Sequence, residues 1–383
     1  MNRFIFSKKI FLPTVPAIIL LLTLTGPGRA EERKPFAIGE TVTIHSKILG
    51  EDRPLFIYTH RAYGEDQSRY PVAYVLDGEW NFHQTSGVID LLSSREAIPW
   101  MIVVGIPNVD RMRDLSPSPI REQPRAGGAV AFRRFLREEV FPFVEARYRT
   151  EPFRMLIGHS LAGLFTVDTL LREPELFSAY LAVGPYLVWD EGKYLDSFRA
   201  RPPARPNALK FFSVILGKEP ELQPALQRLE AMLAECDPSV LVRRVRELAE
   251  YDHITVYPSA VVRGLLDIFP DWRLPPDASA LGLEGIRTHY AGLSLKYGYE
   301  IRPAYFVLIM IADDLMGRGG LDEAIRILQY AAGLDPVLPH AHSSLGRCYR
   351  LKGMIPEARR FYGKALQLAP DDAEARQALA ELK

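Results

Sequence analysis

The hydrophobic positions of this chain follow one pattern between about residues 36 and 272 and another beyond Pro275. In the first region, short runs rich in β-branched and aromatic residues alternate with longer segments whose apolar residues recur every three or four positions. Runs such as Ala73–Leu76 and Phe212–Leu216 are dominated by apolar residues without alternation, which is typical of parallel strands buried on both faces. This alternation of strands and helices predicts a doubly wound α/β sheet.

Eight strands and four helices are predicted in this region. The predicted strands are Thr41–Lys47, Arg53–Thr59, Tyr70–Leu76, Trp100–Ile106, Arg154–Ile157, Ala179–Val183, Phe211–Leu216 and His253–Tyr257. The predicted helices are Val130–Arg147, Leu161–Arg172, Glu221–Ala234 and Ser259–Phe269. The first two strands are separated by the polar residues Gly50-Glu51-Asp52, so we expect them to form an antiparallel hairpin at the edge of the sheet.

The region beyond Pro275 predicts helices only, and it contains an internal repeat. Three pairs of small or proline residues, Ala324/Ala358, Ala331/Ala365 and Pro336/Pro370, are each separated by 34 positions. Helices predicted over Tyr305–Met316 and Ala341–Lys352 both end near a glycine. A helix–turn–helix unit with this period is the signature of the tetratricopeptide repeat. Two copies are fewer than the three usually needed, so a helical pair over Ala280–Tyr297 is expected to form a third layer against the main domain.

The first thirty residues have the layout of a secretory signal peptide. A basic start is followed by the apolar stretch Ile10–Leu24, and Gly28 and Ala30 supply the small residues of a cleavage site. An uncleaved membrane anchor is the alternative, but Pro13 and Pro16 interrupt the apolar run. We therefore expect a bacterial export signal, a periplasmic or secreted mature protein, and no integral membrane span after processing.

Length, charge and cysteine content narrow the class of protein. The chain has 383 residues, enough for two or three units at roughly 150 residues each. It carries 47 basic and 47 acidic residues, so it has no excess of positive charge that would indicate binding to nucleic acid or to an anionic membrane surface. Cys236 and Cys348 are too few for a disulfide framework or a zinc site, and whether they pair is left open. The expected organisation is a signal peptide over 1–30, an α/β domain over 36–272 and helical repeats over 280–383.

The motif Gly158-His159-Ser160-Leu161-Ala162-Gly163 carries the strongest chemical signal. An apolar strand is predicted before it and a helix from Leu161 onward. A serine on such a sharp strand-to-helix turn holds its hydroxyl clear of the backbone, beside the positive end of the helix dipole. Small residues on both sides of the serine let strand and helix cross closely. The alternative is a serine that only caps the helix; the combination of features favours Ser160 as a nucleophile.

A serine nucleophile needs a base, and in this fold class the order along the chain is serine, acid, histidine. His253 fits this order, because the other seven histidines precede the serine or lie beyond Pro275. A histidine on a surface loop is the alternative interpretation. The acid should follow the strand Phe211–Leu216, where Glu219 lies nearest to the strand end. Glu221, Asp252 or a Ser–His dyad without an acid are the alternatives left open.

Acyl transfer also needs backbone N–H donors for the developing oxyanion. One is expected at Leu161, directly after the nucleophile. The second is expected at Glu79, with Gly78 permitting the tight turn that aims its N–H at the site. A plain turn at Asp77-Gly78 is the alternative for this loop.

Three further side chains are candidates for contact with substrate. Trp80 and Trp189 would provide aromatic walls for an acyl or aryl group, or they pack in the core. Arg111 would bind a substrate carboxylate in a bidentate fork, or it pairs with Asp77 or Asp114 to hold a loop.

With these residues placed, the chain resembles the esterase family of α/β-hydrolases that includes esterase D and the enterochelin (ferric siderophore) esterases. The resemblance covers about residues 36–272. Its further marks are Ile106-Pro107-Asn108-Val109-Asp110-Arg111-Met112-Arg113-Asp114-Leu115-Ser116-Pro117 and Phe135-Leu136-Arg137-Glu138-Glu139-Val140-Phe141-Pro142. The segment Gly184-Pro185-Tyr186-Leu187-Val188-Trp189 is similar to the family's Ser-Pro-x-x-Trp-Trp pocket wall, with Gly184 in place of the serine. The resemblance implies Ser160 as nucleophile, His253 as base, Glu219 as acid, and no cofactor.

These observations predict a secreted serine hydrolase that cleaves carboxylic esters through an acyl-enzyme, similar to siderophore esterases. An acyltransferase using the same three residues is an alternative. A binding protein that acts through its repeats, on a hydrolase fold used as a scaffold, is the rival from another class. The expected partners are a small-molecule ester and, through the repeats, a protein partner or a second copy of the chain.

Overall fold

The computed structural model describes residues 36–61, 63–64, 67–198 and 209–382. Contacts between residues make Ile38–Lys383 one compact unit. The predicted signal peptide lies outside the described residues. Within them, every helix is too short or too polar to cross a membrane.

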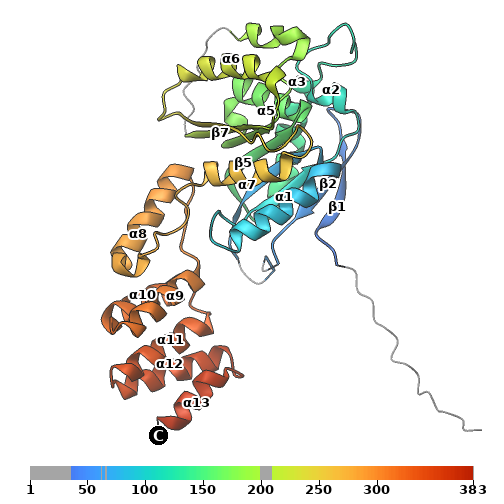
Figure 1. Cartoon of the computed structure of the whole chain (residues 1–383). Helices are drawn as coiled ribbons and strands as arrows, with labels where there is room; N and C mark the ends of the chain where they lie inside the picture. The colour runs from blue at the N-terminus through green and yellow to red at the C-terminus, as the bar shows by residue number, and fades with distance from the viewer. Residues whose placement is uncertain (1–35, 62, 65–66, 199–208, 383) are drawn as a thin grey trace, which may run out of the picture. The chain divides into compact units, whose positions relative to one another are not determined.

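The centre of the fold is an eight-stranded sheet with the strand order β1-β2-β4-β3-β5-β6-β7-β8 (Figure 1). The strands are β1 (Glu40–Ser46), β2 (Glu51–Tyr58), β3 (Tyr70–Leu76), β4 (Ile102–Ile106), β5 (Thr150–His159), β6 (Ala179–Val183), β7 (Lys210–Leu216) and β8 (Leu241–Glu247). β1 and β2 form the expected antiparallel hairpin at one edge, and β2 also runs antiparallel to β4. The strands from β4 to β8 are parallel, which confirms the predicted α/β class.

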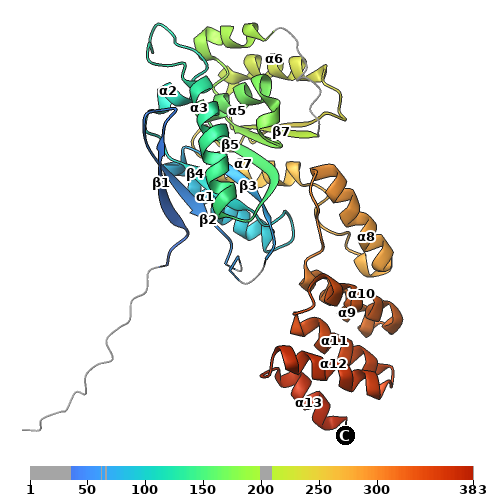
Figure 2. The same cartoon turned by 180° about the vertical axis from the view of Figure 1, so that it is seen from behind.

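Helices cover both faces of the sheet, as Figures 1 and 2 show from opposite sides. The helices of this part are α1 (Gly78–Ser93), α2 (Arg111–Leu115), α3 (Ala129–Phe135), α4 (Phe141–Arg147), α5 (Leu161–Arg172), α6 (Gln223–Ala234) and α7 (Tyr257–Ile268). Successive residues of a strand point to opposite faces. Accordingly, Tyr74 packs in the cluster that contains α3, α5 and α6 residues, and Val75 packs in the cluster that contains α1 and α7 residues.

Two predicted elements differ from the observed ones. The predicted helix Val130–Arg147 is interrupted by a π-helical turn over Leu136–Val140. Pro142 lies just after this turn; it has no N–H to donate, and the Phe141 N–H donates to the Leu136 carbonyl in an i→i−5 bond. The predicted strand His253–Tyr257 is wrong: it is a turn that leads into α7, and the eighth strand is β8.

The described residues of the C-terminal region form helices joined by short turns and loops, without a strand, and they confirm the expected repeats. Its helices are α8 (Ala278–Tyr297), α9 (Tyr305–Gly317), α10 (Leu321–Leu334), α11 (Pro339–Leu351), α12 (Ile355–Leu368) and α13 (Ala373–Glu381). The repeated alanines are fully buried, which agrees with small residues at the helix crossings: Ala324, Ala331, Ala358 and Ala365. Cys236 and Cys348 are both buried and both free, so they do not form a disulfide.

The segment predicted as a helical pair over Ala280–Tyr297 is α8, which is kinked at Gly282. Its last residue, Tyr297, packs against strand and helix residues of the α/β part. The Tyr297 ring centroid is 5.1 Å from that of Phe211 in β7 and 5.8 Å from that of Phe153 in β5. The Tyr297 hydroxyl donates to the Ile268 carbonyl at 2.9 Å. The end of α8 therefore belongs to the aromatic core of the α/β part.

Candidate active site

Ser160 lies between the last residue of β5 and the first residue of α5. Its backbone has φ 60° and ψ −118°, a conformation that costs a non-glycine residue about 1–3 kcal/mol. The surrounding backbone holds it there, because the Ser160 N–H donates to the Val183 carbonyl at 2.9 Å and the Ser160 carbonyl accepts from the Tyr186 N–H at 3.1 Å. The Ser160 side chain makes no capping hydrogen bond to α5. The helix-cap alternative therefore does not describe this serine.

Close contact between backbone segments explains the small residues around Ser160. A Cβ atom at Gly158 would lie 2.2 Å from the Ala162 carbonyl oxygen, and one at Gly163 would lie 2.9 Å from Cα of Pro185. Larger residues would push strand and helix apart and open the turn that carries the serine.

A continuous chain of hydrogen bonds joins Ser160, His253 and Glu219. His253 Nε2 is 3.0 Å from Ser160 Oγ, and His253 Nδ1 is 2.5 Å from Glu219 Oε1. The second carboxylate oxygen of Glu219 accepts the Gly217 N–H at 3.0 Å, and the side chain is buried. Gly184 leaves room for this pair, because a Cβ there would lie 3.0 Å from His253 Nδ1.

The two other acids considered from the sequence lie elsewhere. Glu221 is exposed and lies in the short 3₁₀ turn Pro220–Leu222. The Asp252 carboxylate accepts the N–H groups of Ile254 and Thr255 at 3.0 and 2.8 Å, so it stabilises the turn that carries His253. Of the three candidate acids, Glu219 is the one hydrogen-bonded to the imidazole.

The Glu219 carboxylate raises the pKa of His253 above its ordinary value of 6.5. The hydrogen bond from Glu219 is the main cause, and partial burial of the imidazole opposes it. A raised pKa makes the imidazole a better proton acceptor, while an ester hydrolase still needs it neutral at the start of the reaction.

The two residues expected to supply N–H donors, Leu161 and Glu79, both lie at helix N-termini. Leu161 is the first residue of α5, and Glu79 is the second residue of α1. The first N–H groups of a helix have no partner within the helix. Asp77, at φ 53°, makes the tight turn before α1, and not Gly78 as the sequence predicts. Gly78 is needed for another reason: its Cβ would lie 2.7 Å from the Ile106 nitrogen.

Arg111 pairs with Asp77 rather than lying free. Arg111 Nε and Nη2 donate to Asp77 Oδ1 and Oδ2, both at 2.8 Å, and Asn108 Nδ2 donates to Asp77 Oδ1 at 2.7 Å. The loop after β4 is thus tied to the loop that carries Glu79. The loop-holding alternative for Arg111 is the one that the structure supports.

The two tryptophans predicted as substrate contacts differ in exposure. Trp80 is 60% exposed, and the Arg111 guanidinium carbon lies 5.6 Å from its ring centroid. Trp189 is only 2% exposed, and its Nε1 donates to Ser118 Oγ at 3.1 Å. Trp189 therefore matches the core-packing alternative, and the neighbouring Tyr186, which is 44% exposed, is the aromatic residue of this segment that faces solvent.

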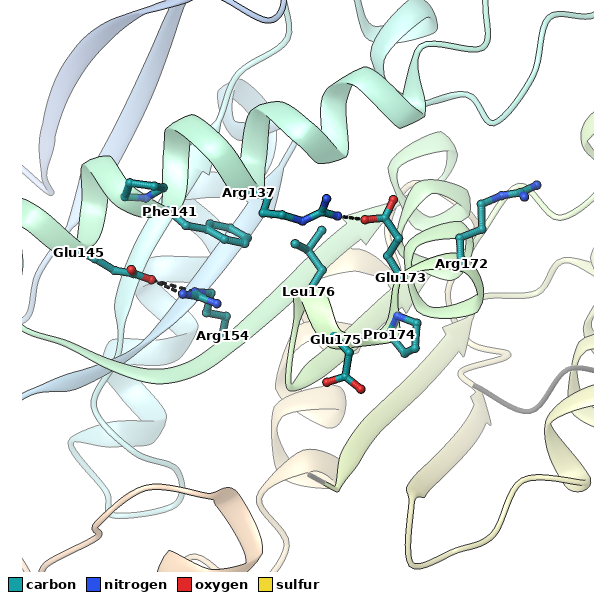
Figure 3. A pocket seen from close by; sticks show the side chains of 10 residues that line it. Arg137, Phe141, Glu145, Arg154, Arg172, Glu173, Pro174, Glu175 and Leu176 are labelled. Atoms are coloured by element: carbon teal, nitrogen blue, oxygen red, sulfur yellow. Dashed lines mark hydrogen bonds and ion pairs between the residues drawn. The ribbon is translucent and has the colours of Figure 1, made fainter. Parts of the chain in front are cut away.

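A hollow of about 580 Å³ lies away from these residues, at the other end of α5 (Figure 3). Ser160 precedes the first residue of α5, whereas Glu173 in the hollow directly follows the last. Charged side chains in the hollow pair with each other, Arg137 with Glu173 and Arg154 with Glu145. In the described part of the chain, no group of three or more His, Cys, Asp or Glu side chains is arranged to hold a metal ion.

Comparison with known proteins places this chain in a family. A family model described as "Putative esterase" matches residues 46–237, half of the chain, and a tetratricopeptide repeat model matches residues 315–382. A ferri-bacillibactin esterase of Bacillus subtilis is 32% identical over 143 residues, covering 32% of this chain and 50% of the relative. A siderophore triacetylfusarinine C esterase of Aspergillus fumigatus is 27% identical over 191 residues, covering 42% of this chain and 65% of the relative. The chain thus spans about half to two thirds of the length of these curated relatives.

Solved structures share the fold. An IroE-like serine hydrolase from Shewanella oneidensis superposes with a TM-score of 0.65 at 22% identity, covering 86% of this chain and 100% of that chain. The siderophore hydrolase EstB from Aspergillus nidulans gives a TM-score of 0.55 at 21% identity, covering 64% of this chain and 99% of that chain. Because the esterase family model matches half of its length, the chain belongs to the esterase family of α/β-hydrolases. It also carries tetratricopeptide repeats at its C-terminal end.

Proposed function

We propose that this protein is a serine esterase that cleaves carboxylic esters through an acyl-enzyme. The observation that carries the proposal is the hydrogen-bonded chain Ser160–His253–Glu219, with the serine held on a strained turn. Ser160 Oγ attacks the ester carbonyl while His253 Nε2 takes its proton, and the N–H groups of Leu161 and Glu79 bind the oxyanion. Glu219 orients the imidazole and stabilises the imidazolium. His253 then protonates the leaving alcohol, and water releases the acid in the reverse sequence.

Labelling with a fluorophosphonate probe tests this proposal. We expect the full-length protein to be labelled once, on Ser160, because only an activated serine hydroxyl attacks the phosphorus. Ser160→Ala should remain unlabelled while retaining the melting temperature of the wild type. Absence of label on the wild type, or equal labelling of Ser160→Ala, would refute the esterase proposal.

The proposed substrates are siderophore-type esters, and the proposed location is the periplasm or the exterior. The activities of the two siderophore esterases compared above support the first proposal, and the composition of the first thirty residues supports the second. The repeats are proposed to contact a protein partner or a second copy. An acyltransferase would use the same residues, and no observation favours it over hydrolysis.

Four large apolar side chains are exposed on the loops and on the first turn of α1, which carry the candidate active-site residues. They are Trp80 (60% exposed), Val109 (50%), Tyr186 (44%) and Ile254 (73%). Trp80 follows Glu79, Val109 follows Asn108, Ile254 follows His253, and the Tyr186 N–H donates to the Ser160 carbonyl. Exposed apolar groups gathered around one site indicate a binding surface. We call these four residues the apolar rim, and we propose that it contacts an apolar or aromatic part of the ester.

The rim predicts a preference for large acyl groups that depends on Ile254. We expect Ile254→Ser to lower kcat/KM for p-nitrophenyl hexanoate by about 10-fold relative to p-nitrophenyl acetate, because burying an isoleucine side chain is worth about 1.5–3 kcal/mol. Leu91→Ser is the matched control, since Leu91 is 56% exposed but lies near the opposite end of α1 from Glu79. An unchanged hexanoate-to-acetate ratio in Ile254→Ser would exclude Ile254 from substrate binding.

A further inference from the structure

His159, the residue directly before the candidate nucleophile, makes two contacts with the candidate base. His159 Nε2 is 2.8 Å from the backbone carbonyl oxygen of His253. The two imidazole rings also pack against each other, with centroids 4.7 Å apart and an interplanar angle of 32°. His159 therefore contacts both the backbone and the ring of His253, from a position fixed by the end of β5.

The hydrogen bond defines the protonation state that His159 needs. A carbonyl oxygen only accepts, so Nε2 must carry the proton that is donated to His253. Burial lowers the pKa of His159, and the hydrogen bond to His253 opposes this shift only in part. Tyr257 packs beside the ring, with centroids 5.6 Å apart. A neutral Nε2–H tautomer satisfies the hydrogen bond and adds no positive charge beside the imidazolium that forms on His253.

The charges around the two histidines are consistent with this arrangement. The negative charges of Glu219, Glu221 and Asp252 all favour the protonated form of His253. The positive charge of protonated His253 in turn disfavours protonation of His159. Asp77 and Glu219 act in the opposite direction on His159, but burial is the larger effect on its pKa. Only one of the two imidazoles is thus set to accept a proton during the reaction.

His253 needs external support because it lies in a turn. Its neighbours are held by the Asp252 carboxylate, but no strand ladder or helix holds the His253 carbonyl itself. The hydrogen bond from His159 connects this carbonyl to the residue next to Ser160. The backbone that carries His253 is therefore held directly to the backbone that carries Ser160. We propose that His159 is a positioning residue for the esterase: it holds His253 at hydrogen-bonding distance from Ser160 Oγ. This inference rests on the proposed function.

Two substitutions separate the contacts that His159 makes. His159→Phe keeps an aromatic ring against His253 and removes the N–H donor, whereas His159→Gln keeps an N–H donor and removes the ring. We expect His159→Phe to lower kcat for p-nitrophenyl acetate by about 10- to 100-fold with KM within about twofold, because a misplaced base slows proton transfer without changing ground-state binding. His159→Gln should recover most of this loss. The rate of fluorophosphonate labelling should follow kcat in both variants.

The outcomes distinguish a failure of this inference from a failure of the proposed function. If the wild type is labelled and turns over, but His159→Phe retains its kcat, the positioning role is wrong and the esterase proposal stands. If His159→Gln is as slow as His159→Phe, the hydrogen bond is not the cause and the proposal is again overturned. If the wild type neither turns over nor accepts the label, both proposals fail. Melting temperatures within about 3 °C of the wild type would exclude general unfolding as the cause.

Discussion

Replacing His253 with alanine is expected to lower kcat for a simple ester by about 10⁴- to 10⁶-fold, which is the size of the loss when the base of a serine triad is removed. The reason is geometric: His253 Nε2 is the nitrogen 3.0 Å from Ser160 Oγ, and the Glu219 carboxylate is aligned with this imidazole. KM should change little, because the imidazole acts on the serine proton and not on ground-state binding. Steady-state kinetics with p-nitrophenyl acetate measure both parameters.

His45 provides a matched control for this substitution. It is also a histidine paired with a carboxylate, since its Nδ1 lies 2.7 Å from Asp52 Oδ1, but both side chains are exposed on the edge hairpin. His45→Ala should keep the wild-type kcat. A His253→Ala variant with near-normal turnover would remove His253 from the proposed mechanism, whatever the behaviour of Ser160.

The turn that carries Ser160 was predictable from the sequence because its constraints are local. Gly158 lies two residues before the serine, and its close contacts with Ala162 and Thr166 depend only on how β5 meets α5. His253 lies 93 residues after Ser160, and no local pattern marks it. It could be predicted only from the order of the triad residues in this fold class. The acid could not be resolved in this way, because Glu219 and Glu221 are two residues apart and only the fold shows which side chain turns inward.

The strand prediction that failed depended on burial, and the choice between the two alternatives for Arg111 depended on distant pairing. β8 is an edge strand with three arginines, so it lacks the apolar run that marked the inner strands. The apolar residues around Val256 and Tyr257 were assigned to a strand, but they are buried because α7 begins there. The pairing of Arg111 with Asp77 spans 34 residues. It follows from the parallel alignment of β3 with β4, which brings the loops after both strands together.

These pairings also limit what Arg111 can do for a substrate. Both oxygens of Asp77 are engaged by Arg111, and Asp77 itself occupies the left-handed conformation that begins α1. An arginine held in this way stabilises the loop that presents the Glu79 N–H. We propose that the apolar rim, rather than a charged group, selects the substrate, in agreement with the zero net charge of the whole chain.

Replacing Glu219 with glutamine is expected to change both the rate and its pH dependence. The buried carboxylate holds the imidazole with Nδ1 protonated and raises the pKa of His253. Glutamine keeps the volume but removes the charge, and it can donate to Nδ1 and so favour the wrong tautomer. By analogy with the loss of the orienting acid in serine triads, kcat should fall by about 10⁴-fold. In the wild type, activity should rise with pH as His253 loses its proton, with a midpoint above 6.5. In Glu219→Gln this midpoint should move to lower pH, because the cause of the raised pKa is gone.

The neighbouring acids make this prediction specific, because Glu221 is exposed and the Asp252 carboxylate is held by turn N–H groups. Glu221→Gln should leave kcat within about twofold of the wild type, and its pH midpoint should shift only slightly, since its charge acts on His253 through solvent. Profiles of kcat/KM between pH 5 and 9 measure the three proteins under the same conditions. If Glu221→Gln shows the large loss and Glu219→Gln does not, the acid is Glu221 and the hydrogen bond between Glu219 and His253 has no role in the reaction. If both variants keep the wild-type rate and midpoint, the protein works with a Ser160–His253 dyad and the buried carboxylate only supports the fold.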